Sequence, residues 1–236
     1  CLRVGRYVPG LTRASGVSLV MLTLVIGNKT YSSWSLRPWL YMRQSGITFE
    51  ERRLALRTPG FASDVARYDA AGLVPILLDG AITVWDSLAI IEYLAEYRRE
   101  AAPWPRERAA RGHARALACE MHAGFRALRM ELPQNLRRPQ LPPRSALSES
   151  CEQDIRRIDQ AWTRCLRAHG GPFLFGDFSP VDAMFAPVAL RFDSYAISLS
   201  QEAQRYVQTL RDLPAVVEFY AAAAAEPESV ASFDQV

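Results

Sequence analysis

Two short apolar runs and one amphipathic stretch follow one another over residues 72–96. Residues 76–78 form the first run, which stops at Asp79-Gly80, and residues 82–85 form the second. Two β-rich runs joined by Asp-Gly predict a tight hairpin. The apolar residues that follow recur at helical spacing, and Asp86-Ser87 places good cap residues directly before them. The pattern therefore predicts a hairpin followed at once by a helix that starts at the edge of a sheet.

The chain before this hairpin is patterned as strand, helix, strand and short helix. Residues 22–27 are almost continuously apolar, which predicts a first strand. A helix is expected to start close to Ser33 or Ser35, because Pro38 is tolerated only in a first turn, and Gly46 ends it. The remaining predicted elements are a second strand over residues 48–56 and a short helix over residues 62–68.

The second half of the chain has a wholly helical pattern. Apolar residues keep three- and four-residue spacing over residues 110–128, which predicts one long helix, and again over residues 155–165. Between them, a proline-rich connection over residues 132–150 is long for a compact domain and is either a lid or a surface excursion. Residues 179–182 (Ser-Pro-Val-Asp) form a capping box with proline in the favoured first position, and a last helical pattern covers residues 214–225.

Composition narrows the class of protein. The chain has 236 residues, of which 49% are hydrophobic and 22% charged, so it suits one large or two small globular domains. The net charge is +3 and the arginines are spread along the chain, which argues against a nucleic-acid surface. Four cysteines without C-x-x-C spacing are too sparse for a disulfide framework, and a reducing compartment is expected. The three histidines have no metal-ligand spacing, and no stretch is long enough to span a membrane.

The predicted helix start at Asp86-Ser87 is also a candidate anion site. Unpaired N–H groups and the positive end of the helix dipole both face outward at a helix N-terminus. Two interpretations follow: the pair either caps the helix and does nothing else, or it also holds part of a ligand.

The order of these features carries a resemblance to a known family. Val74-Pro75, the hairpin and then Asp-Ser-Leu-Ala-Ile-Ile-Glu-Tyr-Leu resemble the glutathione-binding half of the cytosolic glutathione transferase superfamily. The stretch FGDFSPVDAMFAPV, residues 175–188, is similar to a second motif of that family, where it starts a buried helix. The resemblance covers residues 21–225 and implies a thioredoxin-like α/β N-terminal domain followed by an all-α helical C-terminal domain. It also implies a homodimer located in the cytoplasm, with glutathione as co-substrate and no metal.

The resemblance also sets the expected domain boundaries. An N-terminal extension over residues 1–20 is expected to be poorly ordered, since the family's first strand would start at Met21. Its arginines and the apolar run that follows have the general form of a secretory signal, but no small-residue cleavage site follows. The expected thioredoxin-like glutathione-binding domain covers residues 21–98, the linker 99–106 and the all-α domain 107–236.

Four residues would bind glutathione if the resemblance holds. It implies a cis bond between Val74 and Pro75, which would turn the Val74 backbone outward so that the cysteinyl unit of glutathione adds as a strand. The γ-glutamyl carboxylate would lie on Ser87 and the helix N-terminus, and its amino group near the Asp86 carboxylate. Leu73 stands where several relatives have a polar residue, so recognition of the glycyl end is expected to come from elsewhere.

The catalytic group is expected at the start of the first helix. Only a thiolate is nucleophilic, and a hydroxyl that donates a hydrogen bond to it lowers the thiol pKa. The run Tyr-Ser-Ser-Trp-Ser-Leu-Arg is similar to the zeta-class pattern S-S-C-x-x-R, with Ser32 at its first serine and Arg37 at its arginine. Ser32 is the first choice of donor, Ser33 the second and Tyr31 the third; the alternative is that all three only cap the helix. Trp34 replaces the cysteine of that pattern, which argues against thiol-exchange chemistry and weakens the case for isomerase activity.

A second substrate is expected between the two domains, where concave apolar sites usually form. The candidate residues for this pocket are Tyr31, Trp34, Met121, His122 and Phe125. A helical stripe of this kind is more often core than pocket, and His122 is more often a satisfied interior group than a base.

The predicted function is glutathione transfer to a small, largely apolar electrophile. The alternatives are a glutathione-dependent isomerase similar to maleylacetoacetate isomerase, and a non-catalytic binding or interaction protein with the same fold. The sequence does not identify the electrophile.

Overall fold

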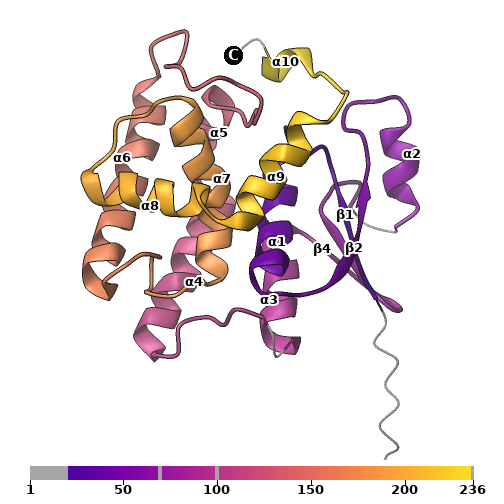
Figure 1. The fold of residues 1–236 in the computed structure, drawn as a ribbon, viewed down its shortest axis with the longest axis horizontal. Coiled ribbons are helices and arrows are strands. Elements are labelled where there is room, and N and C mark those ends of the chain that lie inside the picture. Colours follow the sequence, from indigo (N-terminus) through magenta and orange to yellow (C-terminus); the bar gives the residue numbers. More distant parts are fainter. Residues whose placement is uncertain (1–20, 69–70, 99–100, 235–236) are drawn as a thin grey trace, which may run out of the picture.

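The computed structural model describes residues 21–68, 71–98 and 101–234. The N-terminal half contains one four-stranded sheet, in the order β2-β1-β3-β4 (Figure 1). β1 and β2 are parallel, whereas β1–β3 and β3–β4 are antiparallel. The strands are β1 (Leu22–Ile26), β2 (Phe49–Arg53), β3 (Ile76–Asp79) and β4 (Ile82–Trp85). The predicted hairpin is therefore the β3–β4 pair.

Helices cover both faces of this sheet, which is why its central strand is apolar on both sides. Leu24 and Ile26 of β1 point into the main core, while Val25 between them packs with Val65 on the opposite face. The helices of this half are α1 (Ser33–Gln44), α2 (Phe61–Ala66) and α3 (Ser87–Tyr97). Figure 1 shows α2 on the outer face and α1 and α3 between the sheet and the second half of the chain.

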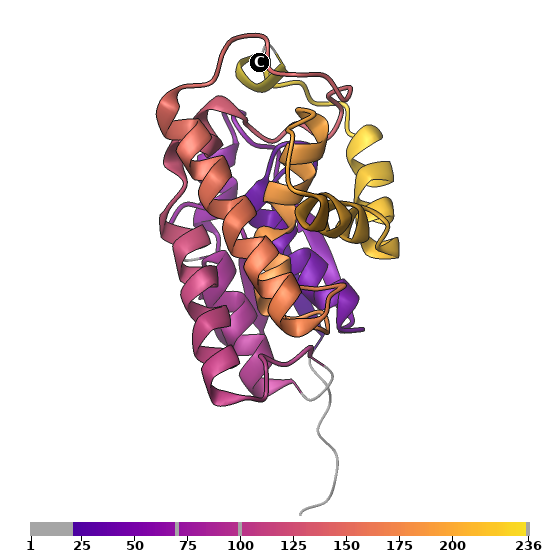
Figure 2. The same ribbon diagram turned by 90° about the vertical axis from the view of Figure 1, so that its left-hand side faces the viewer.

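The second half of the described chain is helical throughout. Its helices are α4 (Arg108–Ala123), α5 (Arg126–Glu131), α6 (Glu149–His169), α7 (Pro180–Ser194), α8 (Gln201–Arg211), α9 (Pro214–Ala224) and α10 (Ala231–Asp234). α7 is almost entirely buried and packs against α1, α3, α4 and α8. α6 lies on the side away from the sheet, in front of the other helices in Figure 2. Thus a thioredoxin-like α/β domain is followed by an all-α domain, as predicted.

A buried capping box starts the central helix α7. The Asp182 carboxylate accepts hydrogen bonds from the Ser179 N–H (2.9 Å) and hydroxyl (3.0 Å), and Pro180 occupies the first helical position. Asp182 also accepts from the Leu174 N–H (3.0 Å) and the Tyr206 hydroxyl (2.9 Å). These four hydrogen bonds replace the bonds to water that the buried carboxylate loses. The helix can therefore begin inside the core.

The prediction of one long helix over residues 110–128 is wrong. The helix ends at Gly124, and Phe125 adopts a left-handed φ of 55° before α5 begins. A Cβ on Gly124 would lie 2.7 Å from the Glu120 carbonyl oxygen, so only glycine permits the close turn at this point. The apolar spacing continues across the break because α4 and α5 both face the same core.

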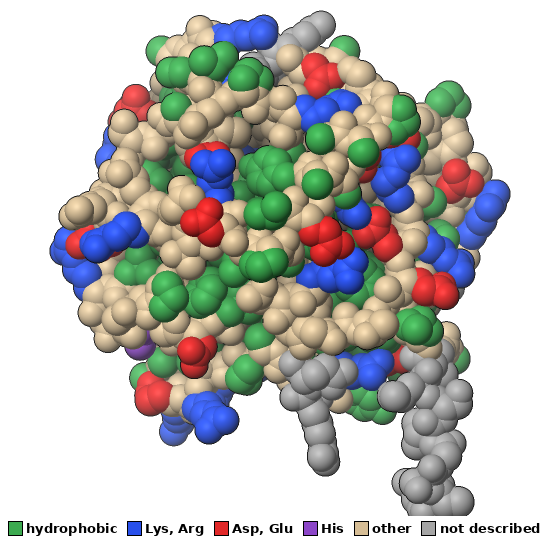
Figure 3. All heavy atoms as spheres, in the orientation of Figure 1, with side chains coloured by type: hydrophobic (Ala, Val, Ile, Leu, Met, Phe, Trp, Pro, Cys, Tyr) green, Lys and Arg blue, Asp and Glu red, His purple; other side chains and the backbone are tan. Residues whose placement is uncertain are grey.

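The predicted N-terminal extension, residues 1–20, lies outside the described residues, and so do residues 99–100 of the predicted linker. The described part of that linker is anchored rather than loose. Trp104 is nearly buried, and its indole N–H donates to Glu92 of α3 at 3.0 Å. Lys, Arg, Asp and Glu side chains are interspersed on the face that Figure 3 shows, with no block of one sign.

Candidate functional site

A groove runs along the edge of the sheet between the N-termini of α1 and α3. Its α3 end has a volume of about 390 Å³ and its α1 end about 530 Å³, and the two ends share Trp34, Leu73 and Val74. The α3 end is also lined by Ala71, Pro75, Trp85, Asp86, Ser87 and His122. The α1 end is also lined by Tyr31, Ser32, Ser33, Leu56, Arg57, Phe61, Arg129, Pro133, Gln134, Arg191 and Phe233.

The middle of the groove is the corner at Val74 and Pro75. The peptide bond between these two residues is cis. The ladder that pairs β3 with β1 and β4 begins only at Ile76. The Val74 N–H and C=O have no hydrogen-bond partner among the described residues. An extended peptide in the groove could pair with them as an added strand.

The start of α3 lies at one end of the groove. Asp86 caps the helix, because one of its carboxylate oxygens accepts from the N–H groups of Leu88 (2.9 Å) and Ala89 (3.2 Å). Its backbone has φ 76° and ψ 134°, a conformation that costs a residue other than glycine of order 1–3 kcal/mol. The next residue, Ser87, is 1% exposed, and its hydroxyl has no hydrogen-bond partner in the described chain. A buried hydroxyl without a partner at a helix N-terminus can donate a hydrogen bond to an anion.

His122, from the last turn of α4, closes this end of the groove from the helical domain. Its Nε2 lies 3.2 Å from the second carboxylate oxygen of Asp86, and its ring meets Trp34 edge to face at 5.4 Å. Nδ1 is buried and has no partner among the described residues. His122 therefore orients the Asp86 carboxylate.

The start of α1 lies at the other end of the groove. Ser32 caps the helix: its hydroxyl oxygen accepts from the Ser35 N–H (3.3 Å) and the hydroxyl donates to the Ser35 oxygen (2.8 Å). Ser35 in turn accepts from the Gly27 N–H at 3.0 Å. Ser33 also lines the groove, but its hydroxyl makes no hydrogen bond with another described residue. Of the two serines, Ser33 is thus the one whose proton has no acceptor within the described chain.

The Tyr31 hydroxyl is already occupied. It donates to the Asp234 carboxylate (2.8 Å) and accepts from Arg137 (2.5 Å) and from the Val230 N–H (3.2 Å). The ring stacks on Phe233 with centroids 5.5 Å apart. Tyr31 holds the C-terminal segment against the groove, and it has little capacity left to bind a thiol.

The C-terminal segment is a wall of the site that sequence reasoning missed. The buried carboxylate of Glu226 accepts from the Lys29 N–H (2.6 Å), the Thr30 N–H (3.0 Å) and the Thr30 hydroxyl (2.9 Å). Glu228 accepts from the Asn28 side chain (3.1 Å). These bonds fix the loop that precedes Tyr31 by contacts nearly two hundred residues apart, which no local pattern could signal.

Arg37 is fully buried between α1 and α7. Its Nε donates to the Met184 carbonyl oxygen at 2.9 Å, and its guanidinium lies 4.1 Å from the centre of the Trp34 ring. Both terminal nitrogens lack a partner within the described chain. Burial, together with the neighbouring arginines Arg191 and Arg129, holds the pKa of Arg37 well below its usual value.

The predicted second-substrate residues divide into two groups. Tyr31 and Trp34 line the α1 end of the groove, and Trp34 and His122 line the α3 end. Met121 and Phe125 line neither end: both belong to the buried core, Met121 with no exposed surface at all. Helical spacing alone cannot distinguish a stripe that faces a cavity from one that faces the core.

Three cationic side chains of the α1 end were not predicted. Arg57 lies in the turn after β2 and has a left-handed φ of 57°, Arg129 lies on α5, and Arg191 lies on α7. All three line the groove, whereas no Asp or Glu of the described residues lines its α1 end.

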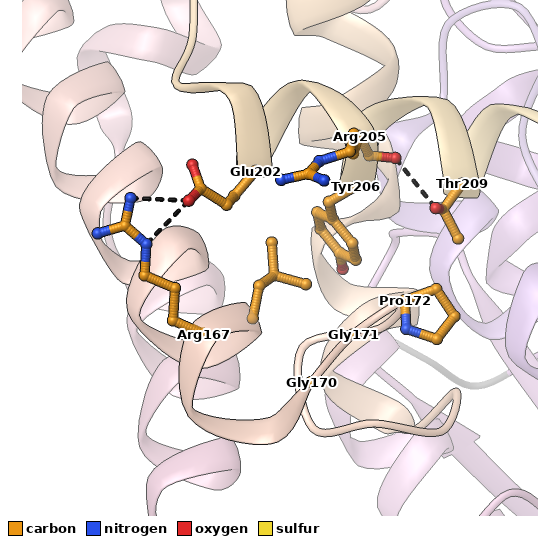
Figure 4. Close-up of a pocket in the computed structure, with 9 residues that line it drawn as sticks. Arg167, Gly170, Gly171, Pro172, Glu202, Arg205, Tyr206 and Thr209 are labelled. Atoms are coloured by element: carbon orange, nitrogen blue, oxygen red, sulfur yellow. Dashed lines mark hydrogen bonds and ion pairs between the residues drawn. The ribbon is translucent and has the colours of Figure 1, made fainter.

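Another hollow, of about 520 Å³, lies between the end of α6 and α8 (Figure 4). Several of its polar side chains bond to other residues of the protein. Arg167 bonds Glu202 (2.7 Å), and the Thr209 hydroxyl donates to the Arg205 carbonyl oxygen (3.0 Å). The hydroxyl of Tyr206 donates to Asp182 in the core. Unlike the groove, this hollow presents no buried side-chain polar atom without a partner among the described residues that line it.

Two further classes of site are absent from the described residues. Across residues 21–68, 71–98 and 101–234, no cluster of three or more His, Cys, Asp or Glu side chains is placed to hold a metal ion. Within those same ranges, no helix combines the length and the apolar character needed to cross a bilayer.

Comparisons with known proteins agree with this geometry. The family described as glutathione S-transferase, N-terminal domain matches residues 31–97. A dichloromethane dehalogenase from Methylophilus leisingeri is 37% identical over 79 residues, which cover 31% of this chain and 28% of the dehalogenase. A probable maleylacetoacetate isomerase from Caenorhabditis elegans is 25% identical over 191 residues, which cover 78% of this chain and 86% of that protein.

A solved structure shares the fold over most of the chain. A Burkholderia glutathione transferase homologue with bound glutathione superimposes with a TM-score of 0.66 at 22% identity, covering 87% of this chain and 100% of that one. Residues 31–97 therefore match a glutathione S-transferase N-terminal domain, and the chain shares the fold of solved glutathione transferases.

Proposed function

We propose that this protein binds glutathione in the groove and uses its thiolate to attack a small electrophile. The observation that carries the proposal is the buried Ser87 hydroxyl at the N-terminus of α3, next to the Val74 backbone in the same groove. Neither group has a hydrogen-bond partner among the described residues. Glutathione offers the two complementary parts: an extended peptide backbone and a carboxylate at one end. The match of residues 31–97 to a glutathione transferase domain supports the same ligand.

Each part of glutathione has a candidate partner. The cysteinyl unit pairs with the backbone of Val74, next to Pro75. The γ-glutamyl carboxylate accepts from the Ser87 hydroxyl and the α3 N-terminus, while its amino group lies near Asp86. Arg57, exposed at the α1 end of the groove, is the candidate for the glycyl carboxylate.

A serine at the start of α1 stabilises the thiolate. A free thiol has a pKa of about 8.5, and lowering it by about two units takes roughly 2.7 kcal/mol. A hydrogen bond to a charged acceptor supplies about 1.5–3 kcal/mol, and the nearby helix N-terminus adds to it. Ser33 is the better donor, because the Ser32 hydroxyl donates to Ser35. The sulfur then forms a bond to the electrophilic carbon while the leaving group departs with its electron pair.

A glutathione-dependent isomerase is a second candidate function. One distant relative is a probable maleylacetoacetate isomerase that matches over most of this chain. The same thiolate would add to the substrate and later leave it. A non-catalytic binding protein would keep the groove and turn nothing over. The homodimer and the cytoplasmic location stay predictions.

Isothermal titration with glutathione tests the proposal first. We expect saturable binding at millimolar concentrations or below, and competition by S-methylglutathione, which lacks the thiol but keeps the peptide and both carboxylates. Absence of binding at millimolar glutathione would exclude both enzymatic functions. If glutathione binds, turnover with aryl halides and epoxides indicates conjugation, and turnover of unsaturated keto acids with no glutathione consumed indicates isomerisation.

A further inference from the structure

The α1 end of the groove has an excess of positive charge. Arg57, Arg129 and Arg191 line it, and none of the Asp and Glu residues that the structure describes does so. The fully buried Arg37 lies next to Trp34. A buried guanidinium without an anionic partner is costly, so proteins seldom keep one without a ligand or a role.

Arg191 is the strongest of these signals. It projects from α7 into the groove and is only 4% exposed, yet its Nε and Nη1 have no hydrogen-bond partner among the described residues. Burial and the nearby charge of Arg129 lower the pKa of Arg191 to about 10, so the side chain is still charged at neutral pH. A charged, planar donor without an acceptor faces a cavity that a small molecule can enter.

Arg129 approaches the same space from α5. Its guanidinium lies 5.6 Å from the Trp34 ring centre, and one terminal nitrogen donates to the carbonyl oxygens of Met121 (3.4 Å) and Gly124. Asp154 is the acidic group whose charge raises the Arg129 pKa, and no salt bridge joins the two side chains in the described part of the chain. Arg129 therefore adds positive charge beside Arg191.

Arg37 deepens the excess of charge without entering the groove. The charges of Arg191 and Arg129 lower the pKa of Arg37, whereas the negative charge of Asp86 raises it. Asp86 is already engaged by the α3 N-terminus and by His122. An anion bound at the α1 end would neutralise part of the positive charge of these arginines.

The other wall residues set the size and character of the rest of the ligand. Leu56, Phe61, Pro133 and Phe233 are apolar and enclose the space beside the serines. Such a wall suits a short carbon skeleton, and the planar guanidinium fork suits a carboxylate, which accepts two parallel N–H bonds.

We propose that the second substrate is a small electrophile that carries a carboxylate, and that Arg191 and Arg129 bind this carboxylate at the α1 end of the groove. The inference rests on the proposed function and changes the expected substrate class, because the sequence predicted an apolar electrophile. Glutathione's own carboxylates are assigned to Ser87 and Arg57, so the two arginines remain available for the second substrate.

A pair of product analogues that differ in charge but hardly in shape tests this substrate class. S-Carboxymethylglutathione and S-carbamoylmethylglutathione carry an acid and the corresponding amide on the sulfur. We expect the protein to bind the acid about tenfold more tightly than the amide, or better, in isothermal titration. The measurement is repeated with the acid and the amide on propyl chains, so that the distance from the sulfur to the arginines does not decide the result.

Variants assign the preference to particular residues. Arg191→Met and Arg129→Met keep most of the side-chain volume but remove the charge, and each should bring the acid-to-amide ratio to within about threefold. The Kd for glutathione itself should change by less than about twofold. Arg126→Met is the matched control, because Arg126 is exposed on the same short helix as Arg129 and should leave the ratio intact.

Three results would overturn the inference. The first is a ratio near one for the unmodified protein with both chain lengths. The second is an equal loss of affinity for glutathione and for the acid conjugate in Arg191→Met, which would make Arg191 part of the glutathione site. The third is an intact preference in both variants. If a variant does not fold, the ratio measured on the unmodified protein decides alone, and a failure of glutathione to bind is seen separately in the first titration.

Discussion

The N-termini of α1 and α3 both face the groove, but they differ in how much of their polar chemistry the protein itself uses. At α1, Ser32 is bonded to Ser35, and Tyr31 is bonded to Asp234 and its neighbours. At α3, the Ser87 hydroxyl is just as buried, yet no partner for it exists in the described chain. The first terminus is largely held by the protein, and the second is left open for a ligand.

This difference separates positioning from binding. Polar groups that are fully bonded fix a backbone, whereas a buried group left without a partner costs about 1–3 kcal/mol until something binds it. α7 provides the reference case, since its N-terminus is buried in the core and the Asp182 carboxylate there accepts four hydrogen bonds from the protein itself. Each prediction below perturbs one of these three helix starts, or the loop that leads into one of them.

The largest effect is expected at the loop before α1, which Glu226 holds in place. Glu226→Ala leaves the buried N–H groups of Lys29 and Thr30 without an acceptor, so the free energy of unfolding should fall by about 3–5 kcal/mol. Urea denaturation measures it. Glu218→Ala is the control: Glu218 forms an exposed ion pair with Arg43 and should cost less than about 1 kcal/mol. Similar losses in both variants would contradict a structural role for Glu226.

The closed start of α7 should make stability depend on pH. Burial raises the pKa of Asp182 from 3.8 to about 6, although its hydrogen bonds from Leu174, Ser179 and Tyr206 oppose the rise. A carboxyl whose pKa is higher in the folded than in the unfolded protein stabilises the fold at low pH, and this contribution is lost as the pH rises through about 6. Between about pH 4 and pH 7, the free energy of unfolding should therefore fall by about 3 kcal/mol relative to Asp182→Asn.

Chemical denaturation of both proteins across this pH range measures the difference. The Asn side chain keeps the shape but cannot titrate. The contributions of all other titrating groups are therefore the same in both proteins and cancel in the difference. Parallel curves for the two proteins would show that hydrogen bonding, not burial, dominates at Asp182.

At the open start of α3, the effect should be on binding and not on stability. Ser87→Ala removes a hydroxyl that has no partner within the described chain, so the free energy of unfolding should change by less than about 0.5 kcal/mol. The loss of one hydrogen bond to a carboxylate should raise the Kd for glutathione by about tenfold to a hundredfold. At α1 the effect should be on stability: Ser32→Ala should lower the free energy of unfolding by about 1 kcal/mol, because a helix cap is lost. An unchanged Kd in Ser87→Ala would remove Ser87 from the site.

Local sequence patterns were sufficient to predict the start of α3 and the strands of the sheet. The predicted hairpin forms, although its turn is Gly80-Ala81, one residue later than predicted, because Asp79 still pairs with Ile82. The Asp86-Ser87 pair starts α3 where the cap signal placed it. The continuous apolar run of β1 and a good helix cap are properties of neighbouring residues, so a sequence displays them directly.

Long-range features escaped prediction. The bond of Glu226 to Thr30 joins residues 196 apart in sequence, and nothing local at either position announces it. Arg191 was not singled out: the sequence predicted a buried helix that starts at residues 179–182, and an apolar pattern does not tell which polar residue on such a helix faces a cavity. The sequence analysis did not predict α8. Four apolar residues keep helical spacing in it (Ala203, Tyr206, Val207 and Leu210), but its other residues are strongly polar.

The smallest and finest difference concerns the two serines at the start of α1. Ser33→Ala should raise the pKa of the bound glutathione thiol by about one unit, because the thiolate loses its donor, so that less thiolate is present at neutral pH. Ser32→Ala should raise it less, since the Ser32 hydroxyl already donates to Ser35. Absorbance of the bound thiolate against pH measures both. A larger shift in Ser32→Ala would mean that the Ser35 hydroxyl donates to Ser32 instead and leaves the Ser32 proton for the thiolate, in which case the start of α1 is as open to its ligand as the start of α3.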